Sequence, residues 1–473
     1  MSGAVTLPPY PEYQSVDDTW FDRIPAHWKA TALRGVLNQR NEKNNPIKTT
    51  QILSLSIAHG VTLYSDRGRG GNKRKGDLSA YKIAHEGDIV LNSMNVIVGA
   101  VGLSRYTGAI SPVYYALYPN TIEASITYYD KVFSNPVFQR YLMIYGRGIL
   151  IKKSDSGKFN TIRMKISPND LKGTLLPLPP RTEQEQIVAY MRAQDAHIAR
   201  FIKTKRDLIK LLTEQKLRII DHAVTRGLDP AVALKPSGIE WLGEVPEHWE
   251  LRRLKFLANN VTNQTTTKAN DEIYLALEHV ESWTGVARPL QGDVEFASTV
   301  KRFVTDDVLF GKLRPYLAKV TRAVRAGVCV SEFLVLRSRK DLVLPAYLEQ
   351  LLRCKRVIDL INSSTAGAKM PRADWTFIGN VRLAVPPVDE QQNILSFIAV
   401  ETKDLDETVR RANDEIKLIL EYRDRLIADV VTGQVDVRGW QPGPEDVVDD
   451  ALLSALGDEN EDVTEEEDGD GED

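Results

Sequence analysis

The chain contains a long internal repeat, and this repeat constrains its fold more than any other feature of the sequence. The segment IPAHW at residues 24–28 returns as VPEHW at residues 245–249. Further along, PPRTEQ at residues 179–184 returns as PPVDEQ at residues 386–391. Because the matches come in the same order, the sequence predicts two copies of one unit of about 200 residues.

The middles of the two copies match more loosely but carry the same secondary-structure signals. Residues Gly87–Leu91 resemble Asp306–Phe310, and further along each copy has an apolar run that begins at a glycine, Gly108–Leu117 and Gly327–Leu336. These runs are rich in Val, Ile, Leu and aromatic residues, which is the composition of β-strands. Each copy is therefore predicted to fold as a globular α/β domain.

A long helix is predicted after each Pro-Pro pair. No Gly or Pro interrupts residues 182–226 or 389–432, and apolar residues recur in both segments at a spacing of three or four with charges between them. The first residue of each segment, a Thr or an Asp, is predicted to cap its helix. Gly227 and Gly433 stand where the helices should end.

These helices are too long to be covered by one small domain. At 1.5 Å per residue, a helix of about 44 residues spans roughly 65 Å. Its apolar stripe would be exposed to water along much of that length unless a second long helix covered it. We therefore expect the two helices to pack on each other in antiparallel fashion, as a spacer between the globular domains. The alternative is that each helix lies on its own domain.

Charge is distributed unevenly along the chain. Residues 445–473 contain 15 Asp or Glu and no Lys or Arg. The first 444 residues carry 61 basic and 49 acidic side chains, a formal charge of +12, although the whole chain has −3. A basic body is expected of a protein that neutralises DNA phosphates. The acidic tail is expected to be disordered, and either keeps the chain in solution or competes with DNA for the basic body.

No motif of a DNA-modifying or ATP-hydrolysing enzyme is complete in the sequence. LPPY at residues 7–10 lacks the Asn or Asp that opens the corresponding loop of amino-methyltransferases, and no Gly-rich loop for a methyl donor accompanies it. A Pro-rich mobile N-terminus is the better interpretation. Gly157-Lys158 lacks the other residues of a P-loop. We therefore expect no catalytic residue and no cofactor.

Metal binding and membrane insertion are also disfavoured. Cys329 and Cys354 have no metal-ligand spacing and are expected to be small buried side chains in a reducing cytoplasm. His27 and His248 recur with the repeat but have no second ligand nearby, so we expect them to pack or form hydrogen bonds within the framework. No apolar stretch is long enough to span a bilayer, and the N-terminus lacks the features of a signal peptide. The sequence predicts a cytoplasmic protein with no metal site.

Basic clusters mark a candidate DNA-binding surface in each copy. Arg and Lys can bind guanine edges or phosphates, and Asn can bind adenine. The first copy offers a Gly-rich loop, for which a solvated charged loop is the alternative, and a later cluster: Arg67, Arg69, Asn72, Lys73, Arg74 and Lys75, then Lys152, Lys153, Lys158, Arg163 and Lys165. The second copy offers Lys301, Arg302, Lys312, Arg314, Tyr316, Lys319, Lys369 and Arg372.

This arrangement resembles the specificity subunits of Type I restriction-modification systems. The resemblance covers nearly all of residues 15–440, and rests on the doubled Pro-x-His-Trp, the doubled Pro-Pro-x-x-Glu-Gln that opens a long helix, and Val224-Thr225 repeated as Val431-Thr432. It implies a non-catalytic protein with two target-recognition domains, each of which binds one half of a bipartite, asymmetric site in double-stranded DNA. It also implies that the long helices form an antiparallel coiled coil that sets the distance between the half-sites.

The resemblance further implies partners and a domain plan. Two methyltransferase subunits would dock near the helices and restriction (translocase) subunits would join them; adenine methylation, translocation and cleavage would belong to those partners. A coiled-coil scaffold that binds proteins and not DNA is the alternative function. The domains expected are an N-terminal extension (1–19), target-recognition domain 1 (20–178), long-helix region 1 (179–235), target-recognition domain 2 (236–385), long-helix region 2 (386–440) and an acidic disordered tail (441–473).

Overall fold

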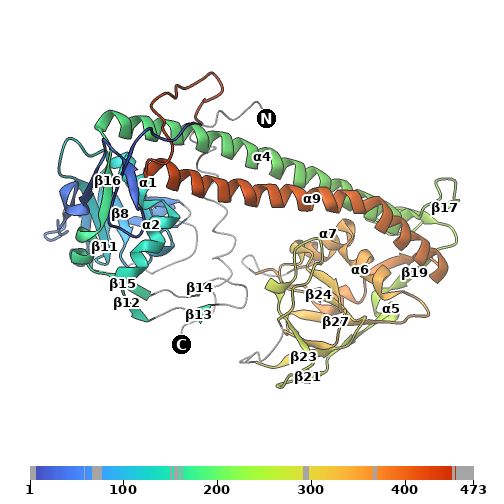
Figure 1. Cartoon of the computed structure of the whole chain (residues 1–473). Helices are drawn as coiled ribbons and strands as arrows, with labels where there is room; N and C mark the ends of the chain where they lie inside the picture. Colours follow the sequence, from blue (N-terminus) through green and yellow to red (C-terminus); the bar gives the residue numbers. More distant parts are fainter. Residues whose placement is uncertain are drawn as a thin grey trace. The chain divides into compact units, whose positions relative to one another are not determined.

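The computed structural model describes residues 7–57, 59–66, 77–149, 152–153, 159–160, 163–290, 298–365, 370–449 and 453. The chain divides into two compact units: unit 1 is formed by Met1–Lys205 and Asn413–Asp473, and unit 2 by Arg206–Ala412 (Figure 1). Both units combine helices with strands, which confirms the α/β fold class. Nowhere in the described ranges does a helix have the length and apolar character needed to cross a membrane.

Unit 1 is built around a four-stranded antiparallel sheet. Its strands are β1 (Tyr13–Ser15), β2 (Arg23–Pro25), β3 (Lys29–Ala32), β4 (Leu37–Arg40), β5 (Leu53–Ser56), β6 (Gly60–Leu63), β7 (Lys82–Ala84), β8 (Ile89–Asn92), β9 (Val101–Leu103), β10 (Gly108–Ile110), β11 (Tyr114–Pro119), β12 (Gly146–Ile149), β13 (Lys152–Lys153), β14 (Phe159–Asn160), β15 (Arg163–Ile166) and β16 (Leu175–Leu178). Its short helices are α1 (Ile126–Phe133), α2 (Pro136–Tyr141) and α3 (Pro168–Gly173). The main sheet has the order β4-β11-β8-β9, and aromatic residues of α1 and α2 share one core with residues of β8 and β11.

Unit 2 repeats this sheet. Its strands are β17 (Leu234–Pro236), β18 (Glu244–Pro246), β19 (Glu250–Arg253), β20 (Ala258–Val261), β21 (Gln264–Thr265), β22 (Ile273–Leu275), β23 (Val300–Phe303), β24 (Val308–Gly311), β25 (Val320–Arg322), β26 (Gly327–Cys329), β27 (Phe333–Ser338) and β28 (Arg382–Val385), and its short helices are α5 (Leu254–Leu257), α6 (Pro345–Arg353), α7 (Lys355–Ser363) and α8 (Trp375–Ile378). The order β20-β27-β24-β25 matches the sheet of unit 1. A second sheet, β21-β23-β26-β22, is antiparallel except at the parallel β22–β26 pair.

The two glycine-led apolar runs each form two strands where the sequence suggested one. In unit 1 the chain turns between β10 and β11, where the Tyr114 amide donates to the Ser111 carbonyl at 2.9 Å. In unit 2 the Phe333 amide donates to the Val330 carbonyl at 3.1 Å, between β26 and β27. The turn moves the chain from one sheet pairing to another, so a single apolar run serves two layers.

Both cysteines are buried free thiols, as the sequence predicted. Cys329 ends β26 inside the core of unit 2, and burial raises the pKa of its thiol to about 12. Burial likewise raises the pKa of Cys354. These side chains therefore pack as small hydrophobic groups.

The long helices are α4 (Arg181–Arg226) and α9 (Val388–Val431), and each contributes one part to each unit. Both begin one residue before the predicted cap, so the predicted Thr and Asp caps are wrong. The carbonyl of Pro180 accepts the Gln184 amide at 3.0 Å and that of Pro387 accepts the Gln391 amide at 3.0 Å, which makes each proline the residue that precedes the helix.

Both helices end at the predicted glycines. Gly227 and Gly433 both have φ of 74°, the left-handed conformation that glycine adopts without strain. A side chain would also be too close to the framework, because a Cβ at Gly433 would lie 2.4 Å from Pro25 and 3.0 Å from Trp28. These two glycines therefore let the chain leave each helix beside a repeated tryptophan.

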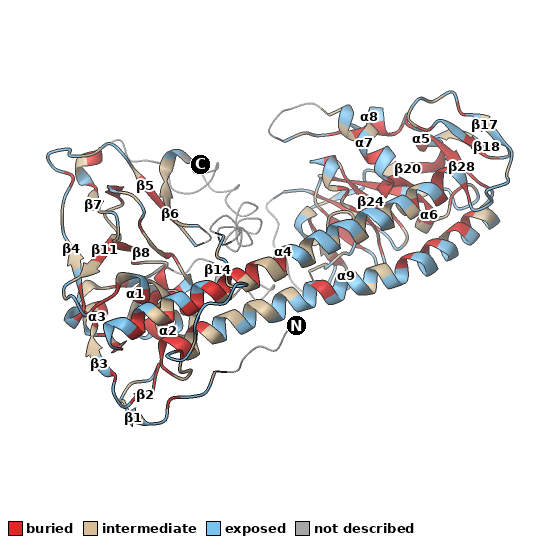
Figure 2. Cartoon of the chain, turned by 90° about the horizontal axis from the view of Figure 1, so that it is seen from above, coloured by how far each residue is buried: buried red, intermediate tan, exposed pale blue. Residues whose placement is uncertain are grey.

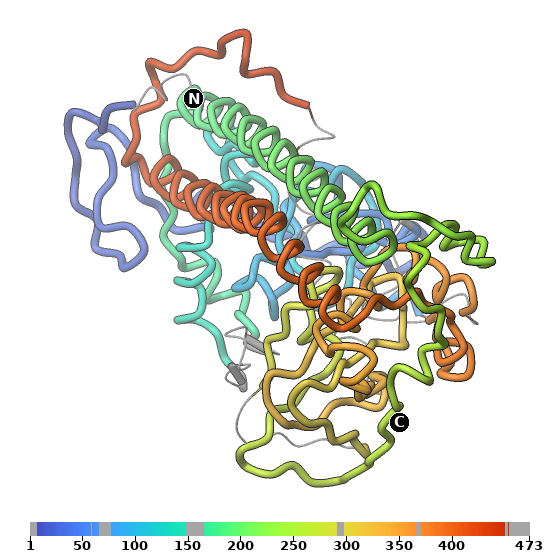
Figure 3. Tube along the Cα trace, turned by 90° about the vertical axis from the view of Figure 1, so that its right-hand side faces the viewer, coloured from blue at the N-terminus to red at the C-terminus, as the bar shows by residue number. Residues whose placement is uncertain are grey.

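Within each unit the two helices run antiparallel and share a core (Figure 3). In unit 1, Ile187 and Met191 of α4 are buried with Ile427 of α9, and Arg423 pairs with Asp195 at 2.7 Å. In unit 2, the other ends of the helices meet in a second core, and Lys216 pairs with Asp406 at 2.5 Å. Figure 2 shows buried residues alternating with exposed ones along both helices. The predicted antiparallel pairing is therefore confirmed.

The repeated Pro-x-His-Trp motif of unit 1 binds the start of α4. Trp28 is fully buried and donates its indole N–H to the Glu183 carboxylate at 3.1 Å. The imidazole Nε2 of His27 lies 2.9 Å from the other carboxylate oxygen of Glu183. His27 is thus a framework residue, as predicted.

Unit 2 builds the same junction at the start of α9. The indole N–H of Trp249 donates to Glu390 at 3.0 Å, and His248 Nε2 lies 2.7 Å from the second oxygen of that carboxylate. These contacts explain why the glutamate of the Glu-Gln pair is repeated. In each unit its carboxylate contacts the indole N–H of the repeated Trp and the Nε2 of the repeated His. This contact ties each globular part to a long helix.

The glutamine beside each glutamate is a buried clamp. Gln184 accepts the Ser125 amide at 2.8 Å and donates to the carbonyls of Glu123 and Pro179, both at 2.8 Å. Gln391 makes the three equivalent bonds in unit 2, at 2.8 to 2.9 Å. Since both side chains are fully buried, all of these polar groups depend on the clamp for their hydrogen bonds.

The N-terminus is anchored, so the prediction of a mobile Pro-rich segment is wrong for its described part. Tyr10 is 3% exposed and donates its hydroxyl to the Glu183 carboxylate. The carbonyl of Pro8 accepts the Asp436 amide at 2.8 Å. The segment therefore covers the junction of unit 1, where a buried carboxylate has room for a third donor.

After α9 the chain returns to lie on α4 within unit 1. In this C-terminal segment (residues 438–449), the ring of Trp440 packs edge-on against Tyr190 with centroids 5.3 Å apart. The imidazole Nε2 of His197 lies 2.7 Å from the Asp446 carboxylate. Trp440 lies just before the predicted acidic tail, and the contact of Asp446 contradicts disorder in the first part of that tail.

Candidate nucleic-acid interface

In unit 2 two chain segments bring the predicted basic residues to one place. The turn between β24 and β25 contains Lys312, Arg314 and Tyr316, and the segment after α7 contains Arg372. The Arg314 amide donates to the Pro371 carbonyl at 2.7 Å, and the Lys312 carbonyl accepts the Ala373 amide at 2.9 Å. These bonds fix the two backbones side by side, with Leu313 opposite Arg372 in an antiparallel bridge. The four residues therefore lie on two adjoining segments, which we call the basic surface of unit 2.

The charges of this surface are only partly neutralised. Arg372 pairs with Glu332 at 3.0 Å. Within the described ranges, neither Lys312 nor Arg314 has an ion-pair partner, and Arg314 is exposed. Tyr316 is 40% exposed beside them. The surface thus offers two unpaired cations and an accessible aromatic ring, groups that bind phosphates and base edges.

Arg314 is held in an unfavourable backbone conformation. Its φ of 50° and ψ of 60° lie in the left-handed region, where a side chain with a Cβ costs about 1–2 kcal/mol. The following Pro315 starts the short 3₁₀ turn η7 (Pro315–Leu317). Backbone strain at an exposed arginine is typical of a residue placed for binding.

Unit 1 forms the corresponding place with other residues. There the Ser93 carbonyl accepts the Ile166 amide at 3.0 Å, which is the counterpart in the repeat of the Lys312–Ala373 bond. When β8 is aligned with β24, Asn95 stands where unit 2 has Arg314, with φ of −125°. Strand β15 therefore lies beside the turn, and its Lys165 is the counterpart of Arg372. The structure describes the backbone of Arg163 on this strand but not its side chain.

Beneath each turn lies a lysine in an equivalent position, half-buried in unit 1 and buried in unit 2. Lys82 donates to the Tyr114 carbonyl at 2.9 Å, and Lys301 donates to the Phe333 carbonyl at 2.7 Å. Donor and acceptor both correspond when β8 is aligned with β24. Burial, with a smaller contribution from the neighbouring Lys165, lowers the pKa of Lys82.

The pKa of Lys301 is lowered in the same way, by burial and then by nearby Lys312. Lys301 is among the basic residues predicted from the sequence, whereas Lys82 is not. The alignment of β8 with β24 could have identified Lys82. When this alignment is extended back to the preceding strands, β7 and β23, Lys82 falls at the position of Lys301. Both lysines sit under the candidate surface and add positive charge to it.

Two other basic residues that the sequence suggested are part of the frame. Arg302 pairs with Glu272 at 2.6 Å, and Lys319 donates to the Leu277 carbonyl at 2.9 Å. The backbones of Lys152 and Lys153 form β13, which pairs with β14. The remaining predicted residues lie outside the described ranges: Arg67, Arg69, Asn72, Lys73, Arg74, Lys75, Lys158 and Lys369. In the described part of the chain no cluster of three or more His, Cys, Asp or Glu could hold a metal ion.

Comparison with known proteins identifies one relative that matches most of the chain and another that matches less than half of it. No family model matches the chain. It is 21% identical over 381 residues to the Type I restriction enzyme EcoDI specificity subunit of Escherichia coli, which covers 76% of this chain and 81% of that protein. It is 23% identical over 206 residues to the putative type I restriction enzyme MjaX specificity subunit of Methanocaldococcus jannaschii, covering 40% of this chain and 47% of that protein.

A solved structure matches the fold. A chain in a structure of a type I R-M system superposes with a TM-score of 0.53 at 14% identity, covering 87% of this chain and 99% of that chain. The sequence match extends over most of both proteins, and the fold match does so as well. In sequence, this chain is thus related to the specificity subunits of Type I restriction enzymes, and it shares its fold with a chain of a type I R-M system.

Proposed function

We propose that this chain is the DNA-specificity subunit of a Type I restriction-modification complex and that each unit binds one half of a bipartite site. One observation carries the proposal: the same frame, fastened by the same hydrogen bonds, presents different side chains at the same place in the two units. Unit 2 has Lys312 and Arg314 where unit 1 has Ser93 and Asn95. A constant frame with variable groups at one site suits the recognition of two different DNA sequences.

The groups on the basic surface of unit 2 match the chemistry of DNA. An unpaired lysine or arginine can neutralise a phosphate, and an arginine can also make two hydrogen bonds to guanine. Arg372 is already held by Glu332, which orients its guanidinium. The buried lysine underneath strengthens the positive potential without itself reaching the surface. These features support binding by charge and by base contact together.

The partners of such a subunit carry the chemistry. DNA and the other restriction-modification subunits bind the chain, and we propose that two methyltransferase subunits and restriction subunits are those partners. The chain itself would supply recognition and no catalytic group. We further propose that α4 and α9, which pair antiparallel within each unit, fix the gap between the half-sites.

The test is to map methylated adenines in cells that express this chain with its methyltransferase subunit. Wild type should yield a bipartite motif with a fixed gap. The double variant Lys312→Ala/Arg372→Ala should relax or lose one half of that motif and leave the other half unchanged, because each lost base contact costs about 1–3 kcal/mol of discrimination.

A matched control is Arg325→Ala, which removes an exposed arginine of unit 2 outside this surface. The control should leave both halves of the motif as in wild type. Equal changes in both half-sites in the double variant would contradict the assignment of one half-site to each unit. Absence of any motif beside a competent methyltransferase subunit would instead favour the scaffold function.

A further inference from the structure

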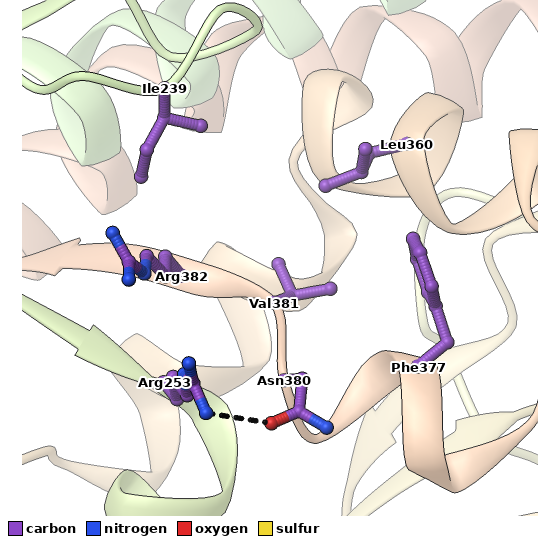
Figure 4. A pocket seen from close by; sticks show the side chains of 7 residues that line it. All are labelled: Ile239, Arg253, Leu360, Phe377, Asn380, Val381 and Arg382. Carbon is purple, nitrogen blue, oxygen red and sulfur yellow. Dashed lines mark hydrogen bonds between the residues drawn. The ribbon is translucent and has the colours of Figure 1, made fainter.

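Four arginines gather on unit 2 away from the segments that form its basic surface. Arg252 and Arg253 come from β19, Arg382 from β28, and Arg339 follows β27. They line two adjoining pockets that share Arg253 and Arg382, the first with a volume of about 530 Å³. Figure 4 shows Arg253 and Arg382 at one side of this pocket, with Phe377 and Leu360 at the other. We call this site the arginine pocket.

Two of these arginines face each other in an unfavourable arrangement. Strands β19 and β28 are antiparallel, and Arg253 is directly opposite Arg382. Like charges at directly opposed positions destabilise a sheet. In the described part of the chain, Arg382 has no hydrogen-bond or ion-pair partner, and Arg253 has only the Asn380 side-chain oxygen at 3.3 Å. Among the described residues no carboxylate forms an ion pair with Arg253 or Arg382, and Glu250 of the same strand pairs with Arg252 instead, at 2.6 Å.

The frame itself does not require these arginines. Unit 1 pairs β3 with β16 in the same register, and there Ala32 stands opposite Leu175. Ala32 and Leu175 correspond to Arg253 and Arg382, because the doubled Pro-x-His-Trp and Pro-Pro motifs beside them align without a gap. The same sheet thus forms with two apolar residues, and the arginine pair of unit 2 is an addition that costs stability. An anionic group bound between the two guanidiniums would remove that cost.

The remaining lining indicates what kind of anion fits. Phe256 is 50% exposed and Phe377 is 39% exposed, which leaves large apolar surfaces in water beside the arginines. Ile239 and Leu360 complete the apolar part of the pocket. Arginine and aromatic residues are enriched in protein–protein interfaces. Lys255 lies beside this lining, with its Nζ 5.6 Å from the centre of the Phe256 ring.

We propose that the arginine pocket binds an acidic segment of a partner protein. Carboxylates of the segment pair with Arg253 and Arg382 through the two-pronged geometry that guanidinium offers. An apolar side chain between those carboxylates lies against Phe377 and Leu360. The proposal does not rest on DNA binding, because the elements that form the pocket are not those that form the basic surface.

DNA is the other class of anionic partner, and the pocket suits it less well. Phosphate contacts come from Arg, Lys, hydroxyl and amide side chains and from backbone N–H groups. A DNA backbone has no apolar group of a size to cover Phe256 and Phe377. An acidic peptide with leucine or phenylalanine side chains satisfies both parts of the lining.

The experiment measures binding of a labelled peptide of repeated Glu-Glu-Leu units to the full chain by fluorescence anisotropy, with a Gln-Gln-Leu peptide as the uncharged probe. The acidic peptide should bind wild type, and the uncharged peptide should bind at least about tenfold more weakly. Arg253→Gln/Arg382→Gln should weaken binding of the acidic peptide about tenfold or more. The control Arg288→Gln/Arg325→Gln removes two arginines of the same unit outside the pocket and should bind as wild type does.

A stability measurement separates a binding role from a structural one. Because Arg382 faces a like charge, the Tm of Arg382→Gln should equal or exceed that of wild type, whereas a structural arginine would lower it on removal. A lower Tm, failure of the acidic peptide to bind, or equal binding by the double variant would overturn the proposal. Loss of affinity for a non-specific DNA duplex in the double variant, with no binding of the peptide, would overturn it in favour of a phosphate site.

Discussion

The two units of this chain share a frame and differ on its surfaces. In both, a buried Trp and a His bind a glutamate at the start of a long helix, and a buried glutamine clamps the adjoining backbone. A lysine that is half-buried in unit 1 and buried in unit 2 lies under the same turn. Residues that are repeated therefore bind other parts of the frame. Residues that are not repeated lie at positions where the frame does not depend on their contacts. At those positions the recognition residues can vary without loss of the fold.

The units also differ in what covers their junctions. Unit 1 adds Tyr10 from the N-terminus and the C-terminal segment, whose Trp440 covers Tyr190 of α4. When the two Pro-Pro motifs are aligned, the residue of α9 that corresponds to Tyr190 is Phe397, which is 39% exposed. The junction of unit 1 is thus covered by additional segments, whereas the equivalent face of the junction in unit 2 is exposed to water.

Removal of the repeated tryptophan should have the largest effect on this comparison. Trp28→Ala and Trp249→Ala each empty a fully buried site and should cost about 3–5 kcal/mol of unfolding free energy in their own unit. The loss should be greater for Trp28, because Glu183 is more deeply buried than Glu390 and keeps its burial when the indole donor is lost. Hydrogen exchange followed by mass spectrometry resolves the two units separately.

Each tryptophan variant serves as the control for the other. Loss of protection from exchange should concentrate in the unit that carries the substitution, including its part of α4 and α9. Equal loss in both units from either variant would show that the chain unfolds as one body, and would break the comparison.

Substitution of the covered Tyr190 and of the exposed Phe397 should give the next largest difference in unfolding free energy. Tyr190→Ala removes a ring that is 7% exposed and should cost about 2–3 kcal/mol. Phe397→Ala removes a ring at the equivalent position of α9 that is much more exposed to water, and should cost at most about 0.5 kcal/mol. Denaturant unfolding of the two variants measures the difference. Equal costs would mean that the C-terminal segment contributes nothing to unit 1.

The pattern of repetition explains how much of the fold the sequence could reveal. Both long helices and both terminal glycines followed from periodicity and from Gly227 and Gly433. The caps were predicted two residues late, because the carbonyl of the proline before each helix accepts the first helical bond and no side-chain motif marks that bond. The contact of Glu183 with Trp28 was also missed, although both belong to doubled motifs, because nothing local brings together residues 155 positions apart.

The candidate site was harder to predict than the fold. Lys312, Arg314, Tyr316 and Arg372 were named as basic or aromatic residues, but their convergence depends on backbone bonds between segments far apart in sequence. Charge alone did not distinguish them from Arg302, whose guanidinium forms an ion pair with Glu272 inside the frame. Such distinctions need the tertiary fold, because an arginine has the same sequence signal whether it is paired or free.

The backbone conformations of the two turns differ, and this difference predicts effects of intermediate size and opposite sign for glycine substitutions. Arg314→Gly should raise the free energy of unfolding by about 0.5–1 kcal/mol, because glycine adopts a φ of 50° without the penalty that a Cβ causes. Asn95→Gly should lower it by a similar amount, because Asn95 has φ of −125° and glycine there adds freedom to the unfolded chain. Thermal unfolding of the two variants tests the signs.

Arg314→Ala separates the backbone from the side chain in this test. It keeps the strain and removes the guanidinium, so it should not be stabilised. Both Arg314 variants should lose affinity for the half-site of unit 2. If Arg314→Gly bound DNA as wild type does, the strain at this position would have no connection with recognition.

The buried lysines give the smallest effect, a difference in pH dependence. Burial lowers the pKa of Lys82 and of Lys301 in the folded chain, while the unfolded chain keeps the ordinary value near 10.5. Between the lowered pKa and the ordinary one, the unfolded chain binds more protons, so the free energy of unfolding rises with pH through that window. Lys82→Met and Lys301→Met should each lose part of this rise relative to wild type.

Replacement of Lys340 by Met is the control for the buried lysines, because the Lys340 side chain is 66% exposed, and it should keep the wild-type slope. Denaturant unfolding at a series of pH values measures the slopes. A variant of either buried lysine with the wild-type slope would mean that water reaches its ammonium group. The positive charge under the two turns would then not be held in the low-dielectric environment that would strengthen its attraction for DNA.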